Sequence, residues 1–97
     1  MITLTKKTKR LPELEKKYGD EKFLFPLGTK RPNRYDKPYI FYSCRVHAGE
    51  VGASYMLKGI LEFIAEYKTN SDANAVLENY VILIIPMLNP DGVFRGH

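Results

Sequence analysis

The chain has few cysteine and histidine residues: one cysteine, Cys44, and two histidines, His47 and His97, among 97 residues. A single cysteine excludes an internal disulfide and fits a reducing compartment. The same scarcity excludes the paired Cys and His spacing of a zinc finger. Because Cys44 lies in an apolar run, we interpret it as a small buried hydrophobic residue rather than a nucleophile.

Long apolar runs are lacking as well. No stretch approaches roughly 18 consecutive apolar residues, the length that crosses a bilayer as a helix. The basic residues near the N-terminus are not followed by the apolar segment of a secretory signal. We therefore expect a cytoplasmic protein with no membrane partner.

Positive charge is concentrated in one part of the chain. Residues 1–37 contain 11 of the 15 basic and five of the 11 acidic residues, so a formal charge of +6 lies here within an overall +4. Such a segment could steer acidic peptides toward the protein, although a solvated loop without a partner is the simpler interpretation. We expect no nucleic-acid partner, because the aromatic residues among these charges form no stacking motif.

The pattern along the chain predicts an α/β fold. Residues 2–5 alternate well enough for an edge strand, and Gly19, Pro26, Gly28 and Pro32 indicate a long loop after it. Residues 38–46 are rich in β-branched and aromatic side chains, which predicts a largely buried strand. The apolar run at residues 80–85 predicts a central parallel strand with both faces covered.

A helix is predicted between these two strands, over residues 51–67, because apolar residues recur there every three or four positions. We interpret this stripe as core packing against the sheet. Its members are Ala53, Met56, Leu57, Ile60, Leu61 and Ile64. Residues 69–72 should end the helix, and residues 73–78 could add a short helical turn. Strand, helix and strand together form a βαβ unit over residues 38–97.

The sequence His47-Ala48-Gly49-Glu50 stands where the first of these strands gives way to the helix. Imidazole nitrogen and carboxylate oxygen are ordinary zinc ligands at about 2.0 to 2.2 Å. The carboxyl ends of strands in open α/β sheets are also where ligand sites are usually built. A catalytic zinc needs about three protein ligands, so another must come from elsewhere. The alternative is a surface turn with Glu50 in the first helical turn, near the positive end of the dipole.

A second polar block, Asn89-Pro90-Asp91-Gly92, follows the second strand, which Pro86 should end. Proline fixes φ at the second turn position and glycine tolerates positive φ at the last, so the block predicts a sharp turn. On its own this is ordinary turn chemistry with a structural role.

Taken together, residues 43–50 with Ala53-Ser54 and residues 85–97 resemble the zinc metallocarboxypeptidases, and within them the cytosolic carboxypeptidase branch. The resemblance implies that His47 and Glu50 are two of three zinc ligands and that residues 89–92 shape the loop entering the substrate pocket. It also implies zinc as cofactor and hydrolysis of C-terminal residues, above all glutamate from tubulin and other acidic protein tails. A cytoskeletal association would follow from that substrate.

The resemblance also implies what residues 1–97 do not hold. In the family, the oxyanion arginine, the carboxylate-binding Asn-Arg pair, the third zinc histidine and the general-base glutamate follow the Asn-Pro-Asp-Gly block. We therefore expect residues 1–97 to be the N-terminal part of a catalytic domain, with a basic strand and loop at 1–37, and no catalytic residue among them. The alternative is a truncated, inactive pseudoenzyme fragment that acts at most as a binding module.

Overall fold

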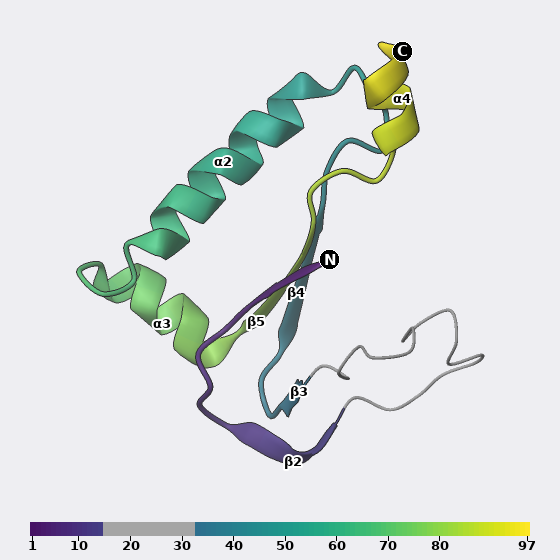
Figure 1. Cartoon of the computed structure of the whole chain (residues 1–97). Helices are drawn as coiled ribbons and strands as arrows, with labels where there is room; N and C mark the ends of the chain where they lie inside the picture. Colours follow the sequence, from purple (N-terminus) through teal and green to yellow (C-terminus); the bar gives the residue numbers. More distant parts are fainter. Residues whose placement is uncertain (15–32) are drawn as a thin grey trace. The chain divides into compact units, whose positions relative to one another are not determined.

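The computed structural model describes residues 1–14 and 33–97. The elements, in chain order, are β1 (Ile2–Leu4), β2 (Arg10–Leu14), β3 (Asn33–Tyr35), β4 (Tyr39–Ser43), α2 (Val51–Ala65), α3 (Ser71–Asn79), β5 (Val81–Ile85) and α4 (Pro90–Arg95) (Figure 1). They form two compact units, one of Met1–Lys6 with Pro38–His97 and one of Lys7–Lys37. The mixture of helices with a mixed sheet confirms the α/β class.

The larger unit is built on a three-stranded sheet with the order β1-β5-β4. Strands β4 and β5 are parallel, with Phe41 opposite Leu83, and β1 pairs with the other edge of β5 in the antiparallel sense. Parallel neighbours need a crossover connection, which α2 and α3 provide. The structure therefore confirms β5 as a central parallel strand and residues 2–4 as an edge strand.

Helices α2 and α3 pack on one face of this sheet. The core cluster consists of Cys44, Leu57, Ile64, Leu77, Ile82 and Ile84. Successive strand residues point to opposite faces, yet Val81 and Ile82 are both buried in β5. Both faces are therefore covered at this end of β5, as predicted. Cys44 is buried, which also confirms its interpretation as a core residue.

Strand β4 differs from the prediction in length and burial. It runs over five residues, Tyr39–Ser43, instead of residues 38–46, and Phe41 is 60% exposed. The physical reason is its position: β4 is the edge of the described sheet, and Phe41 lies on the face opposite the one that α2 and α3 cover. The apolar composition of β4 predicted that other elements cover both of its faces, and among the described residues no element covers the face that carries Phe41.

Helix α2 carries the predicted stripe, with one exception. Leu57 and Ile64 are buried, and Ala53, Ile60 and Leu61 pack against the same core. The prediction for Met56 is wrong, because its side chain is 65% exposed. At about 100° per residue, Met56 lies at the edge of the stripe, roughly 80° from its centre. The helix ends at Ala65, two residues before the predicted end, with Glu66 as its C-cap.

Residues 69–72 follow the end of α2, as predicted, and the helical turn predicted at residues 73–78 is part of α3. Asn70 accepts hydrogen bonds from the backbone N–H groups of Asp72 (3.0 Å) and Ala73 (3.2 Å), and so caps α3, a full nine-residue helix. The predicted turn at residues 89–92 is wrong, because Asn89 is the N-cap of α4 and Pro90 its first residue. Among the described helices, none is long and apolar enough to cross a membrane.

The smaller unit contains the hairpin-like pair β2 and β3. They are antiparallel, with Arg10 opposite Tyr35 and an irregularity before Leu14 pairs with Asn33. The Asp36 N–H donates to the Lys9 carbonyl at 2.8 Å. The predicted long loop was therefore wrong where these strands lie. Its markers, Gly19, Pro26, Gly28 and Pro32, lie outside the described residues.

Candidate metal site

The two candidate ligands lie in the loop between β4 and α2 and face each other. The Nδ1 atom of His47 is 3.0 Å from Oε1 of Glu50. Both side chains are accessible, with 79% and 50% of their surfaces exposed. An ionised carboxylate can only accept hydrogen bonds, so the imidazole N–H donates in this contact. The interpretation of Glu50 as a residue of the first helical turn is wrong: it precedes α2 as the N-cap and makes no capping hydrogen bond.

The electrostatics of this pair favour cation binding. The hydrogen bond from His47 lowers the pKa of the Glu50 carboxyl, and desolvation, which opposes this shift, is the smaller effect. Glu50 is therefore ionised at neutral pH and offers an anionic oxygen beside an imidazole nitrogen. This donor set fits zinc, which binds both atom types. The assignment of His47 and Glu50 as ligands stays a prediction.

Arg45 ties this loop to the start of α2. Its Nε and Nη2 atoms donate to the Ala48 carbonyl at 3.0 and 2.6 Å, and its Nη1 donates to Ser54 Oγ at 3.0 Å. The backbone of Arg45 is in the left-handed region, with φ of 58°. Sequence reasoning assigned no role to Arg45 or Ser54; the only signal was an arginine two residues before the candidate ligand His47.

A second loop, after β5, is hydrogen-bonded to the first. The Leu88 N–H donates to the Cys44 carbonyl at 2.9 Å, and the Asn89 N–H donates to the Arg45 carbonyl at 3.0 Å. The carboxyl ends of the parallel strands β4 and β5 meet here, and ligand sites of α/β sheets are usually built at this edge. The block at residues 89–92 therefore lies beside the candidate metal loop.

Asn89 is held in place by its own helix. Its side-chain oxygen accepts from the Gly92 N–H at 2.9 Å. A Cβ atom added at Gly92 would lie 2.6 Å from the Asn89 side-chain nitrogen, closer than real contacts allow. A side chain at position 92 would therefore displace the capping Asn89 side chain.

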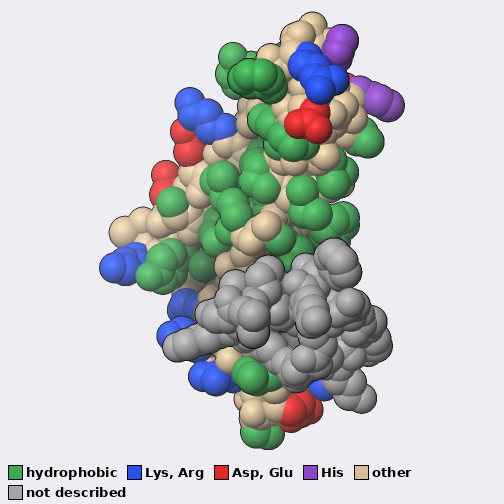
Figure 2. Space-filling view, turned by 45° about the vertical axis from the view of Figure 1, so that its right-hand side comes forward, with side chains coloured by type: hydrophobic (Ala, Val, Ile, Leu, Met, Phe, Trp, Pro, Cys, Tyr) green, Lys and Arg blue, Asp and Glu red, His purple; other side chains and the backbone are tan. Residues whose placement is uncertain are grey.

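A third ligand is not found among residues 1–14 and 33–97: no group of three or more His, Cys, Asp or Glu side chains lies close enough to hold a metal ion. Figure 2 shows both histidine side chains at the same end of the molecule, where α4 lies. His97, however, does not join the pair of candidate ligands. Zinc with about four ligands would need further donors beyond this pair.

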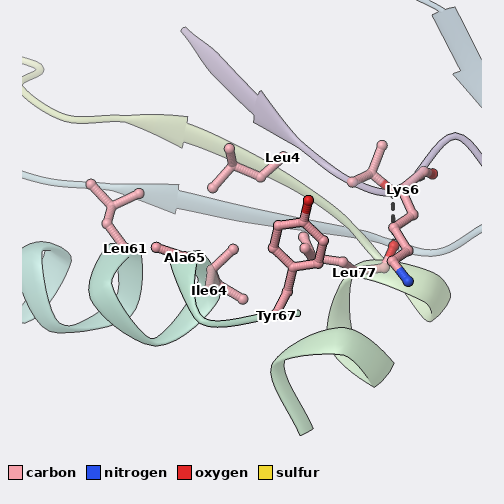
Figure 3. A pocket seen from close by; sticks show the side chains of 8 residues that line it. Leu4, Lys6, Leu61, Ile64, Ala65, Tyr67 and Leu77 are labelled. Atoms are coloured by element: carbon pink, nitrogen blue, oxygen red, sulfur yellow. Dashed lines mark hydrogen bonds between the residues drawn. The ribbon is translucent and has the colours of Figure 1, made fainter. Parts of the chain in front are cut away.

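An apolar pocket of about 450 Å³ lies at the other end of the helix layer (Figure 3). It is lined by Leu4, Thr5, Lys6, Leu61, Ile64, Ala65, Tyr67 and Leu77. Ala65 ends α2 and Glu50 precedes its start, so at 1.5 Å per residue about 22 Å of helix separates this pocket from the candidate ligands. Its walls supply packing surface rather than metal donors.

The fold is α/β, and the two candidate donors lie after the carboxyl end of a parallel strand. Comparison with known proteins identifies the family: the family model described as "Zinc carboxypeptidase" matches residues 1–97. The chain belongs to the zinc carboxypeptidase family. The resemblance seen in the sequence is thereby confirmed.

Individual relatives agree with the family assignment. The chain is 50% identical over 62 residues to cytosolic carboxypeptidase 1 of Gallus gallus, covering 64% of this chain and 5% of that protein. It is 47% identical over 62 residues, with the same coverage, to cytosolic carboxypeptidase 1 of Homo sapiens. It is 43% identical over 89 residues to cytosolic carboxypeptidase-like protein 5 of Mus musculus, covering 91% of this chain and 9% of that protein. The chain thus spans less than a tenth of the length of these relatives.

Proposed function

We propose that this chain is part of the catalytic domain of a zinc-dependent carboxypeptidase, in which His47 and Glu50 bind the metal. The observation that carries the proposal is the 3.0 Å approach of His47 Nδ1 to Glu50 Oε1 at the carboxyl end of a parallel strand. Family membership supports it, because carboxypeptidases of this family are described as zinc enzymes.

The named residues would have different roles in the proposed enzyme. His47 and Glu50 would hold the zinc, which when bound polarises a carbonyl and activates water. A glutamate carboxyl is ionised at neutral pH, and the hydrogen bond from His47 lowers the pKa of Glu50 further, so no proton has to leave the carboxylate before it binds a cation. The Asn89 loop, joined by its backbone to Arg45, would form one wall beside the metal.

For the substrate we propose C-terminal glutamate of acidic protein tails, with tubulin as one such protein. Two features support this. The relatives named above are cytosolic carboxypeptidases, and the first 37 residues of this chain carry a formal charge of +6. A basic segment raises the local concentration of anionic tails, most strongly at low ionic strength. We propose a cytoplasmic location, in line with the names of the relatives.

The test uses the full-length natural protein and two peptides of equal length, one ending in glutamate and one in lysine. Release of the terminal residue is measured for the wild type, for His47→Ala and for Glu50→Gln. We expect the wild type to release glutamate preferentially, with both variants losing bound zinc and turnover together. Full activity of His47→Ala would overturn the metal assignment. Absence of hydrolysis by a zinc-loaded wild type would favour the inactive binding module instead.

A further inference from the structure

We infer that Arg45 is a positioning residue of the candidate metal loop, an inference that rests on the proposed function. The guanidinium group forms hydrogen bonds to two parts of the chain and so fixes their positions relative to each other. One is the Ala48 carbonyl, which lies between the two candidate ligands in sequence, and the other is the Ser54 hydroxyl in the first turns of α2. Holding both fixes the entry of the loop into the helix.

The backbone of Arg45 shows that this arrangement is imposed by its surroundings. A φ of 58° is in the left-handed region, which residues with a Cβ seldom adopt. Such a conformation persists when neighbouring contacts over-determine it. Here the Arg45 carbonyl accepts from the Asn89 N–H at 3.0 Å, while its side chain donates to Ala48. One residue therefore connects the candidate metal loop with both the Asn89 loop and helix α2.

Arginine is suited to this role and lysine is not. Nε and Nη2 lie on the same edge of the planar guanidinium, and both donate to a single carbonyl, while Nη1 remains free to reach the hydroxyl at 3.0 Å. A lysine ammonium has one nitrogen at the end of a flexible stem, so it cannot serve both acceptors in this geometry. The role is geometric, and charge alone does not fulfil it.

The side chains of both candidate ligands are accessible, so packing around them does not fix their positions and the backbone of the loop has to do so. Within the loop, the Glu50 N–H donates to the His47 carbonyl at 3.2 Å, and the Val51 N–H donates to the Gly49 carbonyl at 2.8 Å. A Cβ at Gly49 would touch nothing within 4 Å, so this position is not packed. Groups that orient metal ligands typically change metal affinity about 10- to 100-fold when they are removed.

The experiment measures the zinc dissociation constant of the full-length protein by competition with a chromogenic chelator. Wild type is compared with Arg45→Gln, Arg45→Lys, Ser54→Ala and a control, Arg95→Gln. Arg95 lies in the last turn of α4, outside the loop. The absorption spectrum of the cobalt-substituted protein reports the coordination geometry, and circular dichroism reports the folded fraction.

We expect Arg45→Gln to weaken zinc binding about 10-fold or more and to alter the cobalt spectrum, with Arg45→Lys failing to restore either. Ser54→Ala, which removes one hydrogen bond, should weaken binding about threefold and keeps the test valid if the Arg45 variants do not fold. Arg95→Gln should match the wild type. Wild-type affinity and spectrum in Arg45→Gln, or full rescue in Arg45→Lys, would overturn the inference.

A further variant separates this inference from the proposed function. His47→Ala should remove zinc binding altogether. If it does, while Arg45→Gln binds normally, only the role of Arg45 is wrong. If His47→Ala retains wild-type zinc affinity, the proposed metal site itself is wrong and the Arg45 inference falls with it.

Discussion

At the scale of single residues, the proposed function depends on the His47 and Glu50 pair. Their spacing in the sequence predicted that both could reach one metal, and the structure places the two side chains 3.0 Å apart. The support from Arg45 could not be predicted, because a left-handed arginine leaves no pattern in the sequence. Its hydrogen bonds depend on a loop conformation that only the packed strands define.

One prediction at this scale concerns the pKa of Glu50 in the metal-free protein. His47 lowers it, so His47→Ala should raise it toward the ordinary glutamate value. The pKa of Glu50 is lower in the folded state than in the unfolded state, so this contact contributes fully to stability at pH values above the unfolded-state pKa. The contribution is lost as the pH falls through the folded-state pKa. Carboxyl carbon NMR titration measures this; an identical pKa in both proteins would contradict the contact.

At the scale of secondary structure elements, the sequence predicted best where the hydrophobic pattern decides the outcome. The period of α2 and the continuous apolar run of β5 required no knowledge of neighbours. The segment at residues 89–92 was misassigned because asparagine, proline and glycine favour both a turn and a helix start. The helix forms here because the Asn89 side chain caps it by accepting a hydrogen bond from the Gly92 N–H. Burial of β4 was overestimated because its position at the sheet edge is a property of the fold.

Two glycine substitutions test the account of α4 against a matched control. Gly92→Ala should lower the free energy of unfolding by about 1 kcal/mol or more, since the new Cβ displaces the capping Asn89 side chain. Gly59→Ala, in the middle of α2 with nothing within 4 Å of the new Cβ, should instead stabilise the protein by about 0.5–1 kcal/mol. Denaturant unfolding measures both, and equal effects would contradict the cap.

A second pair of variants tests which apolar residues form the core. Ile84 is fully buried in β5, so Ile84→Ala should lower the free energy of unfolding by about 2–5 kcal/mol. Met56 is 65% exposed, and Met56→Ala should change it by less than about 0.5 kcal/mol. The comparison uses the same unfolding measurement on both variants. A large loss for Met56→Ala would show that the stripe is wider than the structure indicates.

At the scale of the whole molecule, an apolar surface remains on the larger unit. Tyr39, Ile40 and Phe41 of β4 are between 42% and 60% exposed. Apolar strands exposed at a sheet edge promote association between chains. We therefore expect residues 1–97, expressed alone, to aggregate, and Phe41→Lys to increase the soluble fraction. Light scattering at equal protein concentration measures this. A soluble monomer with sharp cooperative unfolding would contradict the expectation.

The sequence predicted some properties of the whole molecule and could not predict others. Family, fold class and the candidate ligand pair were accessible from the sequence because they depend on local patterns and on two motif blocks. Completion of the metal site was not, since zinc with about four ligands needs donors that the described residues do not bring to His47 and Glu50.

The most direct test of the central claim is a crystal structure of the full-length natural protein with anomalous diffraction data collected on both sides of the zinc absorption edge. We expect an anomalous peak in contact with His47 and Glu50, at about 2.0 to 2.2 Å from each ligand atom. A zinc peak bound elsewhere in the protein, with His47 and Glu50 still hydrogen-bonded to each other, would contradict it.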